Sequence, residues 1–191
     1  LTTEEKDDLK KTVDAEGQKA KAAIDAATKD ADVKTAQTNG EKAINAVEIP
    51  ASVSKTDAIN AINAALADKK AAINGTNLTD EEKAKLTTDA NTAAGDAITN
   101  INKATTNAAV NTAKENGVQA IKDIKVPDTS ATKDGAKNAI DQAAKAKNDA
   151  IDASNLTAEE KDTLKQTVAD EVNKAKAAID AATKDADVKT A

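Results

Sequence analysis

The sequence lacks most of the residue types on which catalysis and metal binding depend. It has no Cys, His, Met, Phe, Tyr or Trp, and all 27 of its basic residues are lysines. Without Cys, the chain has no disulfide framework, no thiolate zinc site and no thiol nucleophile. Without His, it has no Ser-His-Asp triad and no imidazole that titrates near neutral pH. We therefore predict that the chain is not an enzyme and that it has no catalytic, cofactor-binding or metal-binding residues.

Large apolar side chains are also scarce. The chain has 7 Leu, 13 Ile and 10 Val among its 191 residues, and such a low content favours disorder unless other features promote folding. Two features do so. The net charge is only −6, and the sequence is rich in Ala, the best helix former, with only 2 Pro and 6 Gly. The composition predicts an all-α protein, with intrinsic disorder as the alternative.

The same absences argue against several classes of ligand. A net negative charge without Arg or aromatic residues does not fit a nucleic-acid-binding protein. No apolar run approaches the roughly 18 residues that a membrane span needs, so we expect no membrane insertion. Asp30-Ala-Asp32 lacks the further ligands and the Gly of an EF-hand calcium loop.

The strongest positive signal is an internal repeat of 77 to 78 residues. The segment LTTEEKDDLK, which begins at Leu1, returns as LTDEEKAKLT at Leu78 and as LTAEEKDTLK at Leu156. Residues 1–36 and 156–191 are identical at 29 of 36 positions. After Pro127, IPASVSKTDA becomes VPDTSATKDGA, so the extra residue of the longer repeat is expected in a loop.

Three helices are predicted in each repeat. The first begins with a Thr-x-x-Glu capping box, in which each side chain accepts a hydrogen bond from the other residue's backbone amide. This box begins at Thr2, Thr79 and Thr157. In the middle copy, apolar residues then recur every three or four positions, as on one face of a helix. They are Leu86, Ala90, Ala94, Ala97, Ile101 and Ala104.

The second helix is expected from about Asn107, with an apolar face that reaches Ile124, and it must stop before Pro127 because a residue preceding Pro is disfavoured in a helix. The third carries one apolar face with a Lys on it, which could extend its ammonium group from the edge of the core. Its positions in the two copies are Ala58, Ile62, Ala65, Lys69 and Ile73, and Ala136, Ile140, Ala143, Lys147 and Ile151.

Short connections between helices favour antiparallel neighbours, so the predicted unit is a three-helix bundle. An odd number of antiparallel helices places the two ends of a bundle at opposite poles. The predicted fold is therefore all-α, with tandem three-helix bundles stacked end to end into an elongated rod. We place a partial repeat of two helices at residues 1–50, a complete repeat at 54–127, and a partial repeat of two helices and the start of a third at 131–191. A unit that starts near Leu78 is the alternative.

Two glycines and three asparagines stand out in this pattern. Gly40 and Gly117 lie on the apolar face of the second helix, where Gly costs about 1 kcal/mol. Close approach of a neighbouring helix is the preferred explanation, ahead of a kink or a ligand contact. Asn74, Asn77 and Asn155 each begin an Asn-x-Thr sequon, which we interpret as punctuation before a capping Thr and not as a glycosylation site.

Four features together resemble the helical repeat known as domain of unknown function 1542. They are the LTxEEK opening, the I-x-x-A-T junction at residues 101–105, the xxVxxAxxxG run into Gly117 and the I-x-x-I-x-V-P ending at Pro127. The resemblance covers essentially the whole chain. It implies tandem repeats in large cell-wall-anchored surface proteins of Gram-positive bacteria, such as SasC-like and Ebh-like adhesins, linked to adhesion, aggregation and biofilm. It supplies no catalytic residues.

The expected function is that of a structural spacer, or stalk, which projects an adhesive region away from the cell wall. Its partners are then the neighbouring repeats of the same chain, and its expected location is the extracellular, cell-wall-anchored bacterial surface. The alternative is a binding module that makes weak multivalent contacts with other copies or with host proteins. The chain lacks the aromatic and Arg anchors of strong binding sites, although repetition can convert weak contacts into avidity.

Overall fold

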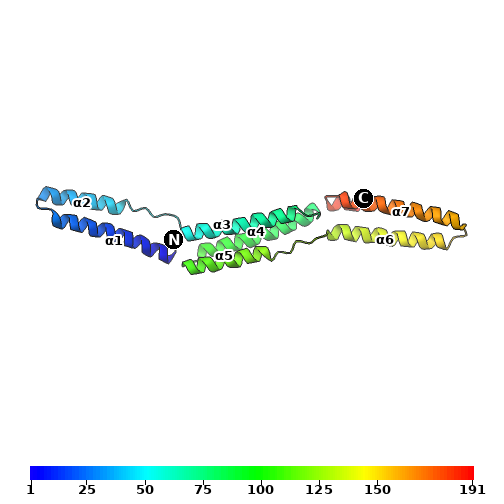
Figure 1. Ribbon diagram of the computed structural model, residues 1–191, viewed down its shortest axis with the longest axis horizontal. Coiled ribbons are helices and arrows are strands. Elements are labelled where there is room, and N and C mark those ends of the chain that lie inside the picture. Colours follow the sequence, from blue (N-terminus) through cyan, green and yellow to red (C-terminus); the bar gives the residue numbers. More distant parts are fainter. The chain divides into compact units, whose positions relative to one another are not determined.

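The computed structural model describes residues 1–191 and contains eight α-helices and no β-strand (Figure 1). This confirms the predicted all-α class. The helices are α1 (Thr3–Ala26), α2 (Asp30–Asn45), α3 (Val53–Asn74), α4 (Asp80–Lys103), α5 (Asn107–Lys122), α6 (Ala131–Asp152), α7 (Ala158–Ala181) and α8 (Asp185–Thr190).

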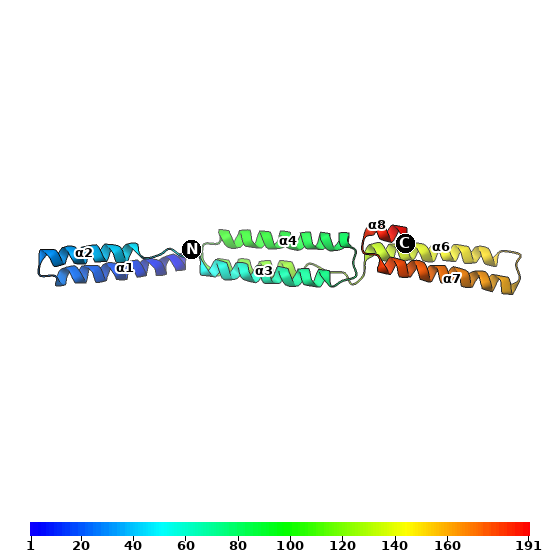
Figure 2. The same cartoon turned by 90° about the horizontal axis from the view of Figure 1, so that it is seen from above.

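The chain forms two compact units whose boundary does not follow the sequence repeat. Unit 1 comprises residues 1–66 and 93–122, and unit 2 comprises residues 67–92 and 123–191. The boundary passes through α3 and α4, so each unit contains residues of two successive repeats. In unit 1, α1 and α2 pack side by side (Figure 1). In unit 2, α6 packs against α7, and the short α8 contacts both (Figure 2).

One core in unit 1 joins α3, α4 and α5. Its side chains are aliphatic and mostly small, in line with the composition. They are Ala58, Ile62, Ala94, Ala97, Ile101, Val110 and Ile121. The three isoleucines have no exposed surface. The periodic apolar positions therefore form the core as predicted, and the three helices of residues 54–127 share it.

The end of the second helix differs slightly from the prediction. The apolar pattern continued to Ile124, but α5 ends at Lys122. The Ile124 carbonyl oxygen instead accepts a hydrogen bond of 2.7 Å from Lys69 Nζ. Carbonyls beyond the last helical turn have no partner within the helix, and a Lys ammonium is a suitable substitute. Lys69 thus bonds the segment after its neighbouring helix, whereas Lys147, at the equivalent position of α6, is exposed.

The extra residue of the longer repeat lies in a connection, as expected. Helix α3 begins at Val53, three positions after Pro50, whereas α6 begins at Ala131, four positions after Pro127. The insertion therefore leaves the lengths of these two helices unchanged at 22 residues each.

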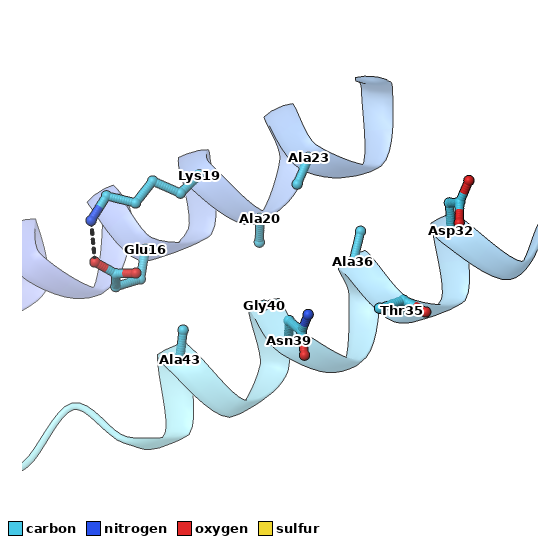
Figure 3. Close-up of a pocket in the computed structure, with 10 residues that line it drawn as sticks. All are labelled: Glu16, Lys19, Ala20, Ala23, Asp32, Thr35, Ala36, Asn39, Gly40 and Ala43. Atoms are coloured by element: carbon cyan, nitrogen blue, oxygen red, sulfur yellow. Dashed lines mark hydrogen bonds and ion pairs between the residues drawn. The ribbon is translucent and has the colours of Figure 1, made fainter. Parts of the chain in front are cut away.

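Close helix approach explains the two glycines. A Cβ atom built on Gly40 would collide with Ala20 Cβ, and one built on Gly117 would collide with Ala97 Cβ and lie 2.7 Å from Ile62 Cδ1. Figure 3 shows Ala20 of α1 pointing toward α2, where Gly40 lies. Neither glycine has a positive φ, so the reason is space and not backbone conformation. This confirms the preferred explanation, and it shows that there is no free room for a methyl group.

We predict opposite effects of adding one methyl group at two glycines. Gly117→Ala should lower the free energy of unfolding by about 1–3 kcal/mol, because α4 and α5 must move apart. Gly117→Leu should cost more. Gly95→Ala is the matched control, because Gly95 lies in the interior of α4 and a Cβ there meets nothing within 4 Å. It should stabilise the protein by about 0.5–1 kcal/mol. Urea denaturation followed by circular dichroism measures both effects, and equal responses at the two sites would contradict the packing argument.

Candidate functional site

The most elaborate polar arrangement lies where one repeat meets the next, and it occurs twice. The first junction consists of residues 2–5, 52–55 and 105–107, all within unit 1. The second consists of residues 79–82, 130–133 and 183–185, all within unit 2. The two sets correspond to each other through the sequence repeat. In each junction, the start of the first helix of one repeat (α1 or α4) meets two elements of the next repeat. These elements are the start of α3 or α6 and the turn that leads into α5 or α8.

A glutamate carboxylate bridges the two repeats at the first junction. Glu5 Oε2 accepts a hydrogen bond of 2.8 Å from the Thr2 N–H, and Glu5 Oε1 accepts one of 3.0 Å from the Ser54 N–H. Thr2 Oγ1 completes the capping box by accepting a hydrogen bond of 3.3 Å from the Glu5 N–H. Amides in the first turn of a helix have no partner inside that helix. One carboxylate therefore satisfies such amides at the starts of α1 and α3.

The second junction repeats this bridge. Glu82 Oε2 accepts a hydrogen bond of 3.0 Å from the Thr79 N–H, and Glu82 Oε1 accepts one of 3.2 Å from the Thr132 N–H. Thr79 lies just before α4, and Thr132 lies in the first turn of α6. We call the arrangement made by Glu5 and by Glu82 the glutamate bridge.

The glutamate before each bridge binds the next repeat as well. Glu4 Oε2 accepts a hydrogen bond of 3.1 Å from the Asn107 N–H, and Glu81 Oε2 accepts one of 3.0 Å from the Asp185 N–H. Asn107 and Asp185 are the first residues of α5 and α8. Both consecutive glutamates of the repeated Glu-Glu pair thus cap helices of the neighbouring repeat.

A direct backbone hydrogen bond adds to the two carboxylates. The Thr3 N–H donates to the Thr105 carbonyl oxygen at 2.7 Å, and the Asp80 N–H donates to the Thr183 carbonyl oxygen at 2.8 Å. Because this contact uses only main-chain atoms, it persists although position 3 holds Thr and position 80 holds Asp. The two junctions therefore share the same three connections.

The side chain that begins α5 differs from its counterpart in α8. Asn107 Oδ1 accepts hydrogen bonds from Thr2 Oγ1 at 2.8 Å and from Ser54 Oγ at 2.9 Å. Asp185 Oδ1 is buried and has no hydrogen-bond partner. The first junction is thus better satisfied than the second at this position.

Near each junction, a lysine in the first turn of α3 or α6 caps the carboxyl end of the following helix, α4 or α7. Lys55 Nζ donates to the Asn102 carbonyl oxygen at 2.6 Å, and Lys133 Nζ donates to the Asp180 carbonyl oxygen at 3.0 Å. These carbonyls lie in the last turns of α4 and α7. Lys133 is buried, with 7% of its surface exposed, and this hydrogen bond gives its ammonium group a partner inside the protein. A cation is favourable at the carboxyl end of a helix.

The contact with the next repeat, and not the capping box itself, buries the threonine. Thr2 and Thr79 have no exposed surface. The same box forms at Thr157 and Glu160, with hydrogen bonds of 2.9 and 3.4 Å, but there both residues are exposed. The third copy thus shows the capping box without the contacts of a following repeat.

Hydrogen bonds hold both bridging carboxylates in the ionised form. The pKa of Glu5 falls from 4.5 to about 2, mainly because the Ser54 backbone N–H donates to it. Burial raises the pKa of Glu82, but hydrogen bonds from the Thr79 and Thr132 backbone and from the Ser130 side chain outweigh burial, so this pKa is also lowered. The negative charge also lies at helix N-termini, where the helix dipole favours it.

The sequence predicted the capping boxes of this site but not the contacts between repeats. It identified the capping boxes at Thr2, Thr79 and Thr157, which the structure confirms. It did not find the second use of the glutamates, or the roles of Ser54, Asn107 and Lys133. One sequence pattern could have indicated the contact between repeats. Ala-Thr-x-Asn or Ala-Thr-x-Asp follows the first helix in every copy, although the helices themselves do not require this pattern.

Open grooves lie elsewhere on the surface. An open groove of about 390 Å³ lies between α1 and α2 (Figure 3), and its counterpart between α4 and α5 measures about 740 Å³. Both are lined by Ala and Gly with Asn, Thr and charged residues. No group of three or more acidic residues is placed to hold a metal ion. None of the helices combines the length and the apolar character needed to cross a membrane.

The fold and the two junctions define a class of protein, an array of all-helical repeats in which each repeat is bonded to the next. The chain belongs to the DUF1542 family (Domain of Unknown Function), whose sequence model matches residues 1–52, 54–129 and 132–191. No solved structure matches the chain.

Curated relatives come from Staphylococcus aureus. The chain is 37% identical over 115 residues to the extracellular matrix-binding protein EbhA of strain Newman, which covers 60% of this chain and 3% of that protein. The extracellular matrix-binding protein ebh of strain COL matches with the same identity and coverage of this chain, over 1% of its own length. The chain thus spans only a small part of these very long relatives, and their names describe matrix binding and not an enzymatic activity.

We predict that the first junction weakens in acid through Glu5. A carboxyl whose pKa is lowered on folding stabilises the protein above its ordinary pKa of 4.5, and that stabilisation is lost as the pH falls toward about 2. Glu5→Gln should therefore cost on the order of 1 kcal/mol near neutral pH and less near about pH 3, because at that pH Glu5 is already protonated in the unfolded chain while folding still requires the carboxylate.

Urea denaturation at the two pH values measures this difference. The exposed Glu48 provides a control, and Glu48→Gln should have little effect at either pH. A Glu5→Gln deficit that is the same at both pH values would show that the carboxylate charge does not support the junction.

Proposed function

We propose that this chain is part of the spacer region of a bacterial surface adhesin and that it projects a binding region away from the cell wall. The observation that carries the proposal is the pair of equivalent junctions, in which each repeat is bonded to the next by the same three connections. Contacts that recur once per repeat favour a protein that grows by adding units. A role in adhesion, aggregation or biofilm would then belong to the whole protein.

The family and the relatives support the location. The chain belongs to a family of repeats, and its relatives are named as extracellular matrix-binding proteins. We infer an extracellular position on the cell surface, with anchoring to the cell wall supplied elsewhere in the full protein. We also propose that the repeating unit begins near Ser54, because α3, α4 and α5 share one core and the family match begins at residue 54.

A catalytic role has no support among the described residues. The carboxylates of Glu5 and Glu82 accept hydrogen bonds from backbone amides, which is the arrangement of a structural cap and not of a free acid or base. We therefore propose a structural function and not an enzymatic one.

A binding module remains the second candidate because of the names of the relatives. Weak multivalent contacts with host matrix proteins or with other copies would suit a surface of Ala, Thr, Asn and Lys, which lacks aromatic anchors. Such contacts would add to the spacer role and would not replace it.

We expect small-angle X-ray scattering to distinguish a spacer from a compact domain. About two and a half repeats of 35–40 Å each should give a maximum dimension of roughly 90–120 Å. A compact globule of this length would have a radius of gyration of about 16 Å. Fragments of one, two and three repeats should lengthen linearly at constant cross-section. A compact particle would contradict the spacer, whereas an elongated particle that self-associates at micromolar concentration would favour homophilic adhesion.

A further inference from the structure

We propose that the tip of each first helix is a docking site for one partner, the following repeat, and that the glutamate bridge fixes the orientation of the two repeats. The inference deepens the proposed spacer function and rests on it for its biological meaning. It assigns a role to the second glutamate of the Thr-x-Glu-Glu motif beyond capping its own helix. It also defines the partner by two short elements, Ser-x-(Ser/Thr)-Lys and Ala-Thr-x-(Asn/Asp).

The geometry of the bridge supports a fixed orientation. The two oxygens of Glu82 are used separately, one for the Thr79 N–H and one for the Thr132 N–H. A planar carboxylate that is bonded on both sides restricts the separation and the relative rotation of the two helices that supply these amides. Glu81 and the Asp80 backbone add contacts to a third helix and its preceding turn. Three connections to two different segments of the next repeat restrict the orientation more than a single hydrogen bond would.

The partner elements are complementary in charge and in hydrogen bonding. The tip presents two carboxylates, and the next repeat presents the N-termini of two helices, whose amides are positively polarised. Ser130 caps its own helix through Lys133 N–H and also supports Glu82, while Lys133 Nζ holds the end of α7 beside the turn at Thr183. These residues form the socket into which the tip fits.

The third copy provides the comparison that isolates docking from capping. Thr157 and Glu160 form the same local capping box as Thr79 and Glu82, but they are exposed. Substitution of Glu160 therefore reports the cost of losing a capping carboxylate alone. Substitution of Glu82 reports that cost together with the loss of the bridge.

Distance measurements between spin labels test the proposal in the full chain. The chain has no native Cys, so Lys85→Cys in α4 and Lys145→Cys in α6 can be labelled selectively. Both side chains are more than three-quarters exposed and both lie in unit 2, on opposite sides of the second junction. The pair Lys145→Cys and Lys174→Cys, on α6 and α7, measures the width expected within one bundle.

We expect the distribution across the junction to be as narrow as the one within the bundle. Glu82→Gln should broaden it, because an amide presents one acceptor and one donor to two N–H groups. Glu82→Asp, which keeps the charge but shortens the side chain, should broaden it as well. Each should also lower the Tm by about 2–4 °C. Glu160→Gln should leave the distribution across the junction narrow, and far-UV circular dichroism verifies that every variant is folded.

The outcomes separate the proposal from the spacer function. A broad distribution in the unsubstituted chain, or one that is unchanged in both Glu82 variants, would overturn the bridge even if scattering shows an elongated particle. A narrow distribution that depends on Glu82, in a particle that is compact by scattering, would support the bridge and reject the spacer.

Discussion

The close contact between α4 and α5 at Ala97 and Gly117 is the constraint on which the rest of the structure depends. No side chain in the core is larger than Ile, so dispersion attraction between helices can be gained only if the backbones approach one another. Gly117 permits this approach because a Cβ atom there has no space. Three of the seven buried residues of this core are Ala, so it contains few large side chains. Polar interactions at the ends of the helices must then contribute a larger share of the stability than they do in an ordinary domain.

The junctions supply these interactions where unpaired backbone groups are concentrated. At the first junction, the N-termini of α1, α3 and α5 converge within unit 1, and each brings amides that have no partner in its own helix. Glu4 and Glu5 supply carboxylate oxygens to all three. The hydrogen bonds that Glu5 accepts at the starts of α3 and α1, chiefly the one from the Ser54 N–H, explain why its pKa lies well below its ordinary value. Helix capping and the connection between repeats are thus performed by the same atoms.

The sequence predicted the helices well because their causes are local. The spacing of Ala90, Ala94, Ala97 and Ile101, the Thr-x-x-Glu boxes and the position of Pro127 each act within a few residues, and the structure follows them closely. The end of α5 was placed two residues too late because the cap at Ile124 comes from Lys69, which is 55 positions away. The glutamate bridge was missed for the same reason. Glu5 and Ser54 are 49 positions apart, and no local pattern indicates which amide a surface carboxylate will meet.

The value of a bonded junction to a spacer follows from how length grows with the number of units. Repeats joined by flexible linkers behave as a chain of beads, whose mean end-to-end distance rises only with about the square root of their number. Repeats held at a constant orientation extend in direct proportion to their number. In a long array, the stiffness of the joints therefore affects reach more than the stability of any one bundle does. Selection for reach would act on residues such as Glu5 and Glu82, whose second hydrogen bond stabilises the joint and adds nothing to the helix in which each residue lies.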